Sequence, residues 1–449
     1  MIQPHLLKHL EQRVPRYTSY PTAADFASQI DATRYVSWLA ELPTATTVSV
    51  YVHIPFCSQL CLYCGCHTTV ARRHSPVEAY VELLLGEIAL VGGILGNRRA
   101  THLHFGGGTP TILMPHDLQR VMAALRMHFH FTTAAEVAIE IDPRTFTREY
   151  AVALAANGFT RVSLGVQDFD AKVQATVNRM QSFEQTARVA DWLRAAGVAK
   201  RNLDLMYGLP YQSVASVTTT IRQALALDAD RIALFGYAHV PWMKHHQRLI
   251  PEHALPGSSQ RFAQSQAAAE VLVSGGYDPI GLDHFAKRDD LLAERQRAGR
   301  LHRNFQGYTT DESRTLIGFG ASAIGALPDG YVQNASSAVA YRNSITAGRL
   351  ATARGCALTA GDRLRRDVIE RLMCDLQVDL AEHCAAHGFN VDYFTGTFAK
   401  LDALAADGLL ERAGSKLKVA AHSRAFVRNV CATFDTYRSY DEEHFSRAC

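Results

Sequence analysis

The sequence lacks long hydrophobic runs and lacks an excess of charge of one sign. No stretch of roughly 18 apolar residues, about the length that spans a membrane, occurs in the chain, and Met1–Pro15 carries no apolar signal-peptide segment. The 46 basic and 43 acidic residues give a net charge of only +3, so no broad field attracts nucleic acid or an anionic membrane. We therefore expect a cytoplasmic protein that binds neither nucleic acid nor membranes.

Low-complexity tracts are also missing, so extended disorder is excluded. The chain is 47% hydrophobic and 20% charged, which is ordinary for a folded globular protein. Its 449 residues are enough for a sizeable core, either in two or three domains or in an α/β barrel with additions.

A disulfide framework fits the cysteine distribution poorly. The chain has nine cysteines, an odd number, and five of them scatter over the C-terminal third. The other four lie within ten residues and follow an apolar strand: Cys57, Cys61, Cys64 and Cys66.

The spacing C-x3-C-x2-C of Cys57, Cys61 and Cys64 favours iron–sulfur chemistry over structural zinc. A cubane cluster normally takes four thiolates, so three ligands would leave one iron open to a small molecule. The alternative is a zinc ion completed by Cys66 as a fourth thiolate. Cys66 could instead face a substrate or pack in the loop.

Six strand–helix units in series predict a parallel sheet, because parallel strands need crossover helices. The first strand alternates Val50, Val52 and Ile54 against Tyr51 and His53, so these last two side chains share a face. The six expected strands are Thr47–Pro55, Thr101–Phe105, Glu136–Ile141, Arg161–Val166, Asn202–Tyr207 and Arg231–Phe235. We expect an α/β fold with a partial (β/α)6 barrel.

Unusual residues follow almost every one of these strands. In a barrel or partial barrel, active sites are assembled at the C-terminal strand ends, so the segments should converge on one cavity. The segments are the cysteine loop, Gly106–Pro110, Glu140 with Asp142, Gln167, Asp204 and Ala238–Pro241. Glu140, Gln167 and Asp204 could hydrogen bond a ribose and an α-amino group, and Arg179 could pair with a carboxylate. We interpret His245 and His246 as a surface pair.

The strand–helix repeat fades after Tyr277. We expect an N-terminal extension over 1–46, the barrel over 47–290, a loop-rich connection over 291–357 and a mostly helical domain over 358–449. In the last domain, helices at Arg363–Leu380 and Asp392–Ala406 precede a hairpin that turns at Gly414-Ser415. Helices followed by a hairpin resemble a winged-helix module, but no dense basic patch accompanies it.

The motifs of the chain resemble those of the oxygen-independent coproporphyrinogen III oxidases, which are radical S-adenosylmethionine enzymes. The resemblance covers about residues 15–435 in family order. Its segments are Pro15–Pro21, Tyr51–Cys66, Gly106–Pro110, Glu140–Arg144, Gly165–Phe169, Asn178-Arg179, Asp204–Pro210 and Tyr237–Trp242.

The resemblance implies the ligands and cofactors of the site. Cys57, Cys61 and Cys64 would bind a [4Fe-4S] cluster whose open iron takes S-adenosylmethionine. The active site would hold two S-adenosylmethionine molecules, and Tyr51, His53 and Cys66 would be catalytic. The implied cofactor contacts are Tyr51, Tyr63, Gly107, Gly108, Thr109, Glu140, Gln167, Arg179, Asp204, Ala238 and Ile324.

The implied reaction converts two propionates of coproporphyrinogen III to vinyl groups. A 5′-deoxyadenosyl radical would take hydrogen from the propionate β-carbon, and loss of CO2 and one electron would follow. An unidentified donor would supply electrons, and we expect a monomer. Arg16 is expected over the barrel mouth, where it could meet a propionate carboxylate.

Two other functions compete with this one. A sister family of haem-binding chaperones shares the barrel and three cysteines, but usually has an aromatic residue at the position of Cys66 and lacks the Arg16–Pro21 segment. A zinc-stabilised interaction protein would contain stoichiometric zinc without iron or acid-labile sulfide.

Overall fold

The computed structural model describes residues 4–438 of the chain. One twelve-stranded sheet organises most of them, with neighbours in the order β16-β15-β14-β13-β1-β4-β5-β6-β7-β8-β10-β9. Its middle seven strands are parallel. They are β13 (Leu316–Phe319), β1 (Val48–Ile54), β4 (Arg98–Gly107), β5 (Phe129–Ile141), β6 (Arg161–Gln167), β7 (Lys200–Tyr207) and β8 (Arg231–Gly236).

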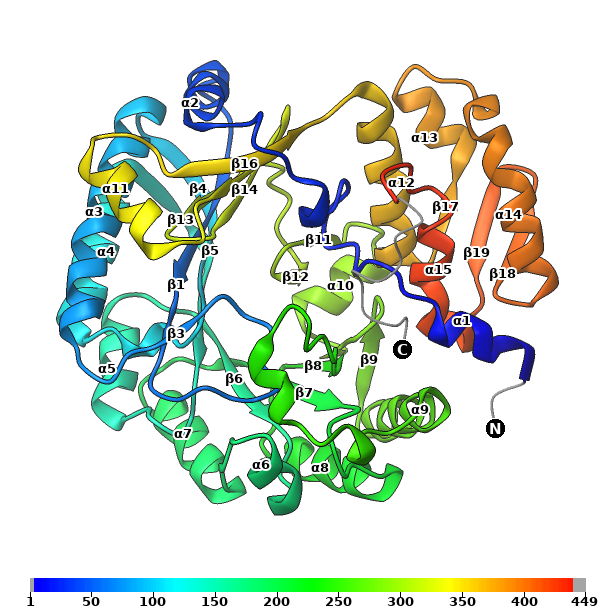
Figure 1. The fold of residues 1–449 in the computed structure, drawn as a ribbon, viewed down its shortest axis with the longest axis horizontal. Coiled ribbons are helices and arrows are strands. Elements are labelled where there is room, and N and C mark those ends of the chain that lie inside the picture. The colour runs from blue at the N-terminus through cyan, green and yellow to red at the C-terminus, as the bar shows by residue number, and fades with distance from the viewer. Residues whose placement is uncertain (1–3, 439–449) are drawn as a thin grey trace.

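The sheet curves into an open barrel with helices on its outer side (Figure 1). These helices are α3 (Ser75–Leu95), α4 (Pro115–His128), α5 (Arg148–Ala156), α6 (Ala171–Thr176), α7 (Phe183–Ala195), α8 (Val214–Ala226), α9 (Ser258–Ser274) and α11 (Ala338–Thr346). Within the described residues, none of the helices combines the length and apolar character needed to cross a bilayer. All six predicted strands are present as parallel neighbours in chain order, which confirms this part of the predicted fold.

Alternation along β1 explains how the sheet presents polar groups to the inside. Val50, Val52 and Ile54 are at most 1% exposed and belong to the main hydrophobic core. Tyr51 and His53 point to the other face, where the Tyr51 hydroxyl lies 3.0 Å from Nδ1 of His53. The predicted shared face of these two side chains is therefore confirmed.

The prediction of a loop-rich connection over 291–357 is wrong. This segment supplies β13 as a seventh parallel strand and extends the sheet beyond it with antiparallel strands. Its strands are too short, at three to six residues, for alternation to identify them. The segment contains α10 (Leu291–Arg297), β11 (His302–Asn304), β12 (Gly307–Thr309), β14 (Ile324–Leu327), β15 (Gly330–Asn334) and β16 (Thr352–Ala357). The opposite edge carries β9 (Tyr277–Ile280) and β10 (His284–Lys287), and β2 (Phe56–Cys57) pairs with β3 (Thr69–Val70).

The C-terminal region has a separate hydrophobic core around helices and a three-stranded sheet of order β17-β19-β18. The expected hairpin is present and turns at Gly414, whose φ is +63°. Its elements are α12 (Ala360–Asp375), β17 (Gln377–Asp379), α13 (Leu380–Ala386), α14 (Thr395–Ala406), β18 (Leu410–Ala413), β19 (Lys416–Val419) and α15 (Val427–Cys431).

The N-terminal segment joins the two cores. Leu10 of α1 (Leu7–Glu11), Tyr17 and Tyr20 are buried in the C-terminal core, whereas α2 (Ala32–Glu41) packs against the barrel through Trp38 and Leu39. In Figure 1 this blue segment passes in front of the gap between the barrel and the orange and red C-terminal region. Short 3-10 helices complete the chain at Pro4–Leu6, Ala23–Asp25, Pro110–Ile112, His245–Leu249, Glu252–Ala254, Val391–Phe394 and Ala421–Phe426.

Candidate functional site

The cysteine loop leaves the C-terminal end of β1, and hydrogen-bond donors surround its first three thiols. Thr68 Oγ1 and Thr109 Oγ1 lie 3.2 and 3.4 Å from Sγ of Cys57. The backbone N–H of Cys66 lies 3.4 Å from Sγ of Cys64. Donors of this kind stabilise the thiolate form, which is the form that binds metals.

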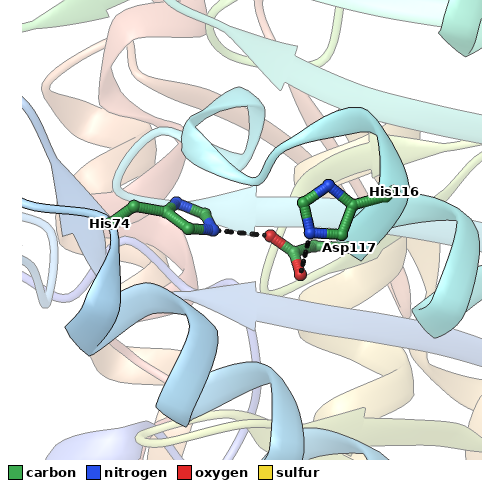
Figure 2. A group of neighbouring side chains, drawn as sticks. All are labelled: His74, His116 and Asp117. Atoms are coloured by element: carbon green, nitrogen blue, oxygen red, sulfur yellow. Dashed lines mark ion pairs between the residues drawn. The ribbon is translucent and has the colours of Figure 1, made fainter.

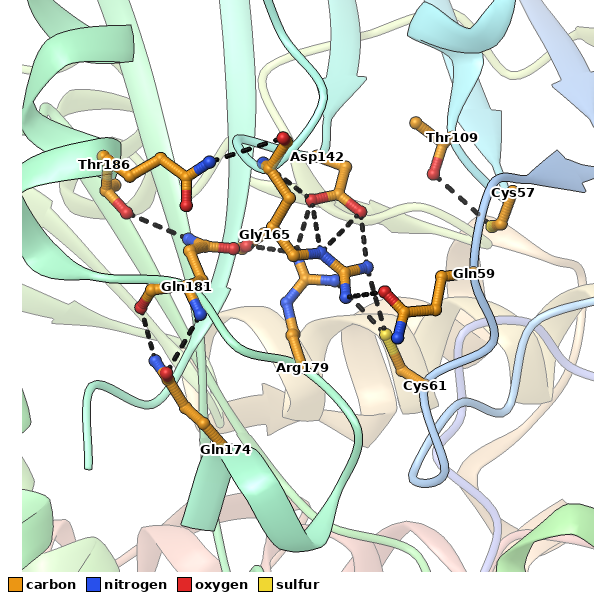
Figure 3. Close-up of polar contacts among 12 residues, drawn as sticks. Cys57, Gln59, Cys61, Thr109, Asp142, Gly165, Gln174, Arg179, Gln181 and Thr186 are labelled. Atoms are coloured by element: carbon orange, nitrogen blue, oxygen red, sulfur yellow. Dashed lines mark hydrogen bonds and ion pairs between the residues drawn. The ribbon is translucent and has the colours of Figure 1, made fainter. Parts of the chain in front are cut away.

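Two arginines approach the thiol of Cys61, and Figure 3 labels one of them, Arg179. Nη1 of Arg179 and Nη2 of Arg144 each lie 3.4 Å from its Sγ. Asp142, at the end of β5, holds both guanidinium groups, at 2.6 Å from Arg144 and 3.5 Å from Arg179. Arg179 also donates to the carbonyl of Gly165. Arg144 was missed in the sequence analysis, although its place two residues after Asp142 was a usable signal.

The turn that carries Arg179 is fixed by buried amides. Gln174 Nε2 donates to the carbonyls of Asp168 and Gln181, at 2.7 and 2.6 Å, and its Oε1 accepts from the N–H of Gln181 at 3.0 Å. Figure 3 shows this network beside the Arg179–Cys61 contact. These hydrogen bonds fix the turn that places the Arg179 guanidinium beside the cysteine loop.

The thiols of Cys57, Cys64 and Cys66 differ in the direction of their pKa shifts because their surroundings differ. A hydrogen bond from the Cys66 thiol lowers the pKa of Cys64 to about 7, and the same bond raises the pKa of Cys66 well above its usual value. Burial raises the pKa of Cys57, partly offset by its two threonine donors. Cys66 thus carries the proton of this pair.

A single zinc ion does not fit these four thiols. Zinc binds thiolates at about 2.3 Å in a tetrahedron, so its sulfur ligands lie roughly 4 Å apart. Within residues 4–438, only His74, His116 and Asp117 form a group of three or more ligand atoms that all lie within 4.8 Å of one another. No three of the loop thiols form such a group, and the ligands of a multi-iron cluster need not, because they bind different metal atoms.

The His74, His116 and Asp117 group lies on the outer side of the barrel, at the N-terminal ends of α3 and α4 (Figure 2). The Asp117 carboxylate is completely buried, and His74 and His116 approach different oxygens of it at 2.9 and 3.4 Å. The carboxylate lies between the two imidazoles and also accepts from the N–H of Met114 at 3.3 Å.

The glycine loop after β4 packs on the cysteine loop. The N–H groups of Gly108 and Thr109 donate to the carbonyls of Ile54 and Phe56, at 2.9 and 2.7 Å. A Cβ on Gly107, whose φ is +117°, would lie 2.7 Å from the His53 ring, and one on Gly108 would lie 2.5 Å from the Phe56 carbonyl oxygen. The glycines are thus needed for close approach to the protein itself, and their predicted contact with S-adenosylmethionine stays a prediction.

Glu140, Tyr51 and His53 form a polar group beside this loop. Glu140 accepts from the N–H of Gly107 at 3.2 Å and lies 3.3 Å from Nε2 of His104, and its side chain is 40% exposed to the interior. The pKa of His53 is lowered by burial, so the ring is neutral. Its Nε2 lies 3.0 Å from the carbonyl of His67 and must donate, so Nδ1 accepts the proton of the Tyr51 hydroxyl. Burial and the charge of Glu140 raise the pKa of Tyr51, which keeps that proton.

Glu140 and Asp204 both line an interior cavity of about 190 Å³. Asp204 accepts from Ser163 and Asn202 at 2.8 Å each, and burial raises its pKa to about 6. Gln167 ends β6 at a bulge with φ of +71°. The structure therefore brings Asp204 and Glu140 together as expected.

Tyr63, Ala238 and Ile324 lie around this centre. Tyr63 packs against Tyr237 and Ile250, and its carbonyl and that of Ala238 both accept from Gln247. Ile324 begins β14 and packs beside Phe26 and Tyr331. Because β14 runs antiparallel to β13, Ile324 lies beside Gly318, which pairs with Tyr51 of β1, so it is near the same edge of the sheet as the parallel strand ends.

A second loop holds the cysteine loop by its backbone. Lys244 Nζ donates to the Cys66 carbonyl at 3.0 Å, His246 Nε2 to the Cys64 carbonyl at 2.8 Å, and Gln247 Nε2 to the Tyr63 carbonyl at 3.0 Å. We call Lys244, His246 and Gln247 the clasp. The interpretation of His246 as a surface residue is wrong, while His245 is exposed. Contacts to backbone carbonyls leave no spacing pattern in the sequence, so the clasp could not be predicted.

Comparisons with known proteins agree on one family. The model of the Radical SAM superfamily matches residues 51–224. An oxygen-independent coproporphyrinogen III oxidase of Bradyrhizobium diazoefficiens is 51% identical over 98% of both chains, and one of Paracoccus denitrificans is 42% identical over 95% of both. The crystal structure of coproporphyrinogen III oxidase (HemN) from Escherichia coli, described as a radical SAM enzyme, superposes with a TM-score of 0.90 at 38% identity, covering 95% of this chain and all of that one.

Proposed function

Because this chain belongs to the oxygen-independent coproporphyrinogen III oxidases of the radical SAM superfamily, we propose that it converts two propionates of coproporphyrinogen III to vinyl groups, giving protoporphyrinogen IX. The observation that carries the proposal is the cysteine loop with three donor-stabilised thiols at the mouth of a parallel barrel. Glu140 lies beside the glycine loop that packs on the cysteine loop, and it shares an interior cavity with Asp204.

Membership of the superfamily implies a [4Fe-4S] cluster and S-adenosylmethionine. When bound, they supply a carbon radical that can take a hydrogen atom from an unactivated C–H bond. We assign Cys57, Cys61 and Cys64 to the cluster, because each of their thiols has at least one hydrogen-bond donor in the structure. The Cys66 thiol itself donates to Cys64, so we leave it out of the ligand set and propose a role next to the substrate.

The barrel residues bind and orient S-adenosylmethionine in this proposal. Arg179 and Glu140 offer opposite charges beside the cysteine loop, which suits the carboxylate and amino groups of an amino acid. Above its pKa of about 6, Asp204 is ionised and can accept hydrogen bonds from the hydroxyl groups of a ribose. Gly107, Gly108 and Thr109 shape the loop that supports these groups, with Tyr63, Gln167, Ala238 and Ile324 as further contacts. We propose two S-adenosylmethionine molecules, one for each propionate.

Tyr51, His53 and Cys66 form the proposed catalytic group. The Tyr51 proton is directed at Nδ1 of His53, so the Tyr51 oxygen is left as an acceptor toward the interior. The segment of Tyr17–Tyr20 and the β11–β12 hairpin line a cavity that adjoins the interior, which supports their role in excluding water. We propose that the protein acts as a monomer and receives electrons from a separate donor.

Product analysis under anaerobic conditions tests the proposal. Reconstituted protein with a chemical reductant, S-adenosylmethionine and coproporphyrinogen III should form protoporphyrinogen IX and two molecules of 5′-deoxyadenosine per product. Tight haem binding without vinyl product, from protein with an intact cluster, would instead support a haem chaperone.

A further inference from the structure

The group of His74, His116 and Asp117 brings three metal-ligand side chains together outside the barrel. One atom from each residue lies within 4.8 Å of the other two, and no other set of three or more such side chains does so among residues 4–438. In Figure 2 both imidazoles face the Asp117 carboxylate, His74 from the residue before α3 and His116 from the start of α4. None of the roles assigned to the barrel interior uses this group.

The distances within the group are close to those of ligands around one ion. Nε2 of His74 lies 2.9 Å from one oxygen of Asp117, and Nε2 of His116 lies 3.4 Å from the other. Nitrogen and oxygen ligands bind zinc at about 2.0–2.2 Å in a tetrahedron, which places neighbouring ligand atoms roughly 3.3 Å apart. The His116 side chain is 61% exposed, so its ring can rotate toward a shared ion and water can complete the coordination.

Hydrogen bonds within the protein do not account for the polar atoms of the group. Nε2 of His74 and Oδ1 of Asp117 are buried, and neither has a hydrogen-bond partner among residues 4–438. Both imidazole contacts therefore bring atoms close together without the direction that a hydrogen bond requires. The Asp117 side chain is 0% exposed, and its Oδ2 accepts from the N–H of Met114 at 3.3 Å. A buried carboxylate with a free oxygen is costly unless a bound cation compensates it.

The donor atoms select the class of ion. Two imidazole nitrogens and one carboxylate oxygen suit zinc and similar divalent transition metals, whereas magnesium and calcium take oxygen ligands. Two histidines and one carboxylate, with a position left open to water, also form a common zinc site. The N-terminal ends of α3 and α4 oppose a cation through their helix dipoles. We therefore expect binding at micromolar rather than nanomolar concentrations.

The position of the group indicates what an ion would do there. His74 follows β3, which pairs with Phe56–Cys57 at the start of the cysteine loop. His116 and Asp117 begin the helix that follows the glycine loop Gly106–Pro110. These two loops are hydrogen bonded to each other at the barrel mouth. An ion shared by the three side chains would join the same two segments a second time, from the outer side.

We propose that His74, His116 and Asp117 bind a divalent transition-metal ion of the zinc type, which links the starts of α3 and α4. The site lies outside the barrel and takes a different metal from the cluster, so this proposal is independent of the proposed function. The ion has a structural role. It should raise the thermal unfolding midpoint, because it binds the folded group and not the three residues of the unfolded chain.

Equilibrium dialysis of the cluster-loaded protein against zinc tests the site. Wild type should bind about one zinc ion per chain, with a higher thermal unfolding midpoint. Loss of an outer-shell partner alone weakens metal binding about 10–100-fold, so His116→Gln and His74→Gln, which lose a direct ligand, should weaken it roughly a hundredfold or more. His130→Gln, at an exposed position of β5, is the matched control and should bind zinc as wild type does. Iron content of each variant verifies folding.

X-ray absorption at the zinc edge of the same wild-type sample identifies the ligands. We expect nitrogen and oxygen at about 2.0–2.2 Å and no sulfur at about 2.3 Å. Sulfur in the zinc shell would assign the ion to the cysteine loop and overturn the proposal. So would zinc binding of wild-type strength in both histidine variants, or no binding at micromolar zinc. None of these results touches the proposed function, which fails separately if the wild type forms no vinyl product.

Discussion

At the scale of single residues, Cys66 differs from its three neighbours because hydrogen-bond donors are directed at their sulfur atoms, whereas its own thiol donates to Cys64. We expect Cys57→Ser to remove the cluster and the activity together. Cys66→Ser should retain most of the iron and acid-labile sulfide but lose vinyl formation, because it changes a group beside the substrate. Iron and sulfide determination on anaerobically purified variants measures both effects. Loss of the cluster in Cys66→Ser as complete as in Cys57→Ser would make Cys66 a ligand.

At the scale of elements, Glu87 ties helix α3 to the edge of the sheet that the sequence did not predict. Its carboxylate accepts from the N–H of Gly320, from Asn334 and from the Tyr341 hydroxyl, at 2.7, 2.5 and 2.7 Å. Burial raises its pKa from 4.5 to about 7, despite these hydrogen bonds. The folded protein therefore holds a proton between pH 4.5 and 7 that the unfolded chain has lost.

This proton makes stability depend on pH with a definite sign. The contribution of Glu87 to the free energy of unfolding is greatest below pH 4.5 and declines by about 3 kcal/mol as pH rises through 7. We expect Glu87→Gln to lack this decline, so its stability relative to wild type should increase from pH 5 to pH 8. Urea denaturation at several pH values measures the difference, with the exposed Glu78→Gln as control. A difference that stays constant with pH would refute the assignment.

Element prediction succeeded where hydrophobic alternation and strand length were sufficient. β1 and β6 were found because seven residues with a clear period leave little ambiguity. β13 was missed because its four residues are all buried and show no alternation. The convergence of Glu140 and Asp204 could be predicted from the order of the strands. The clasp could not, because it depends on contacts between side chains and carbonyls almost 180 residues apart, and such contacts leave no local pattern.

At the scale of the whole molecule, the N-terminal segment is part of the C-terminal core. Leu10 is fully buried there, and the Tyr17 hydroxyl donates to Asp435 at 3.0 Å. The predicted domain boundary at residue 46 therefore follows the order of the chain but not its packing. Residues that pack together here are more than 400 positions apart in the sequence. Long-range packing of this kind has no signature in periodicity, although the Pro15–Pro21 motif marked the segment.

Leu10→Ala should destabilise the C-terminal region without affecting the cysteine loop. Truncation of a buried leucine costs about 2–5 kcal/mol of the free energy of unfolding. We expect a lower urea midpoint for that region with unchanged iron content, and Glu11→Ala, at an exposed position of the same helix, should leave both unchanged. Wild-type stability of Leu10→Ala would show that the segment does not contribute to the C-terminal core.

The clasp residues donate hydrogen bonds to backbone carbonyl oxygens, which every amino acid has. The clasp binds Tyr63, Cys64 and Cys66 through their backbone carbonyls, so these hydrogen bonds do not depend on which side chains occupy positions 63 and 66. Those side chains are free to diverge while the loop keeps its path. One scaffold can in this way acquire a new substrate by exchanging the residues that face it, with the anchoring of the loop inherited unchanged.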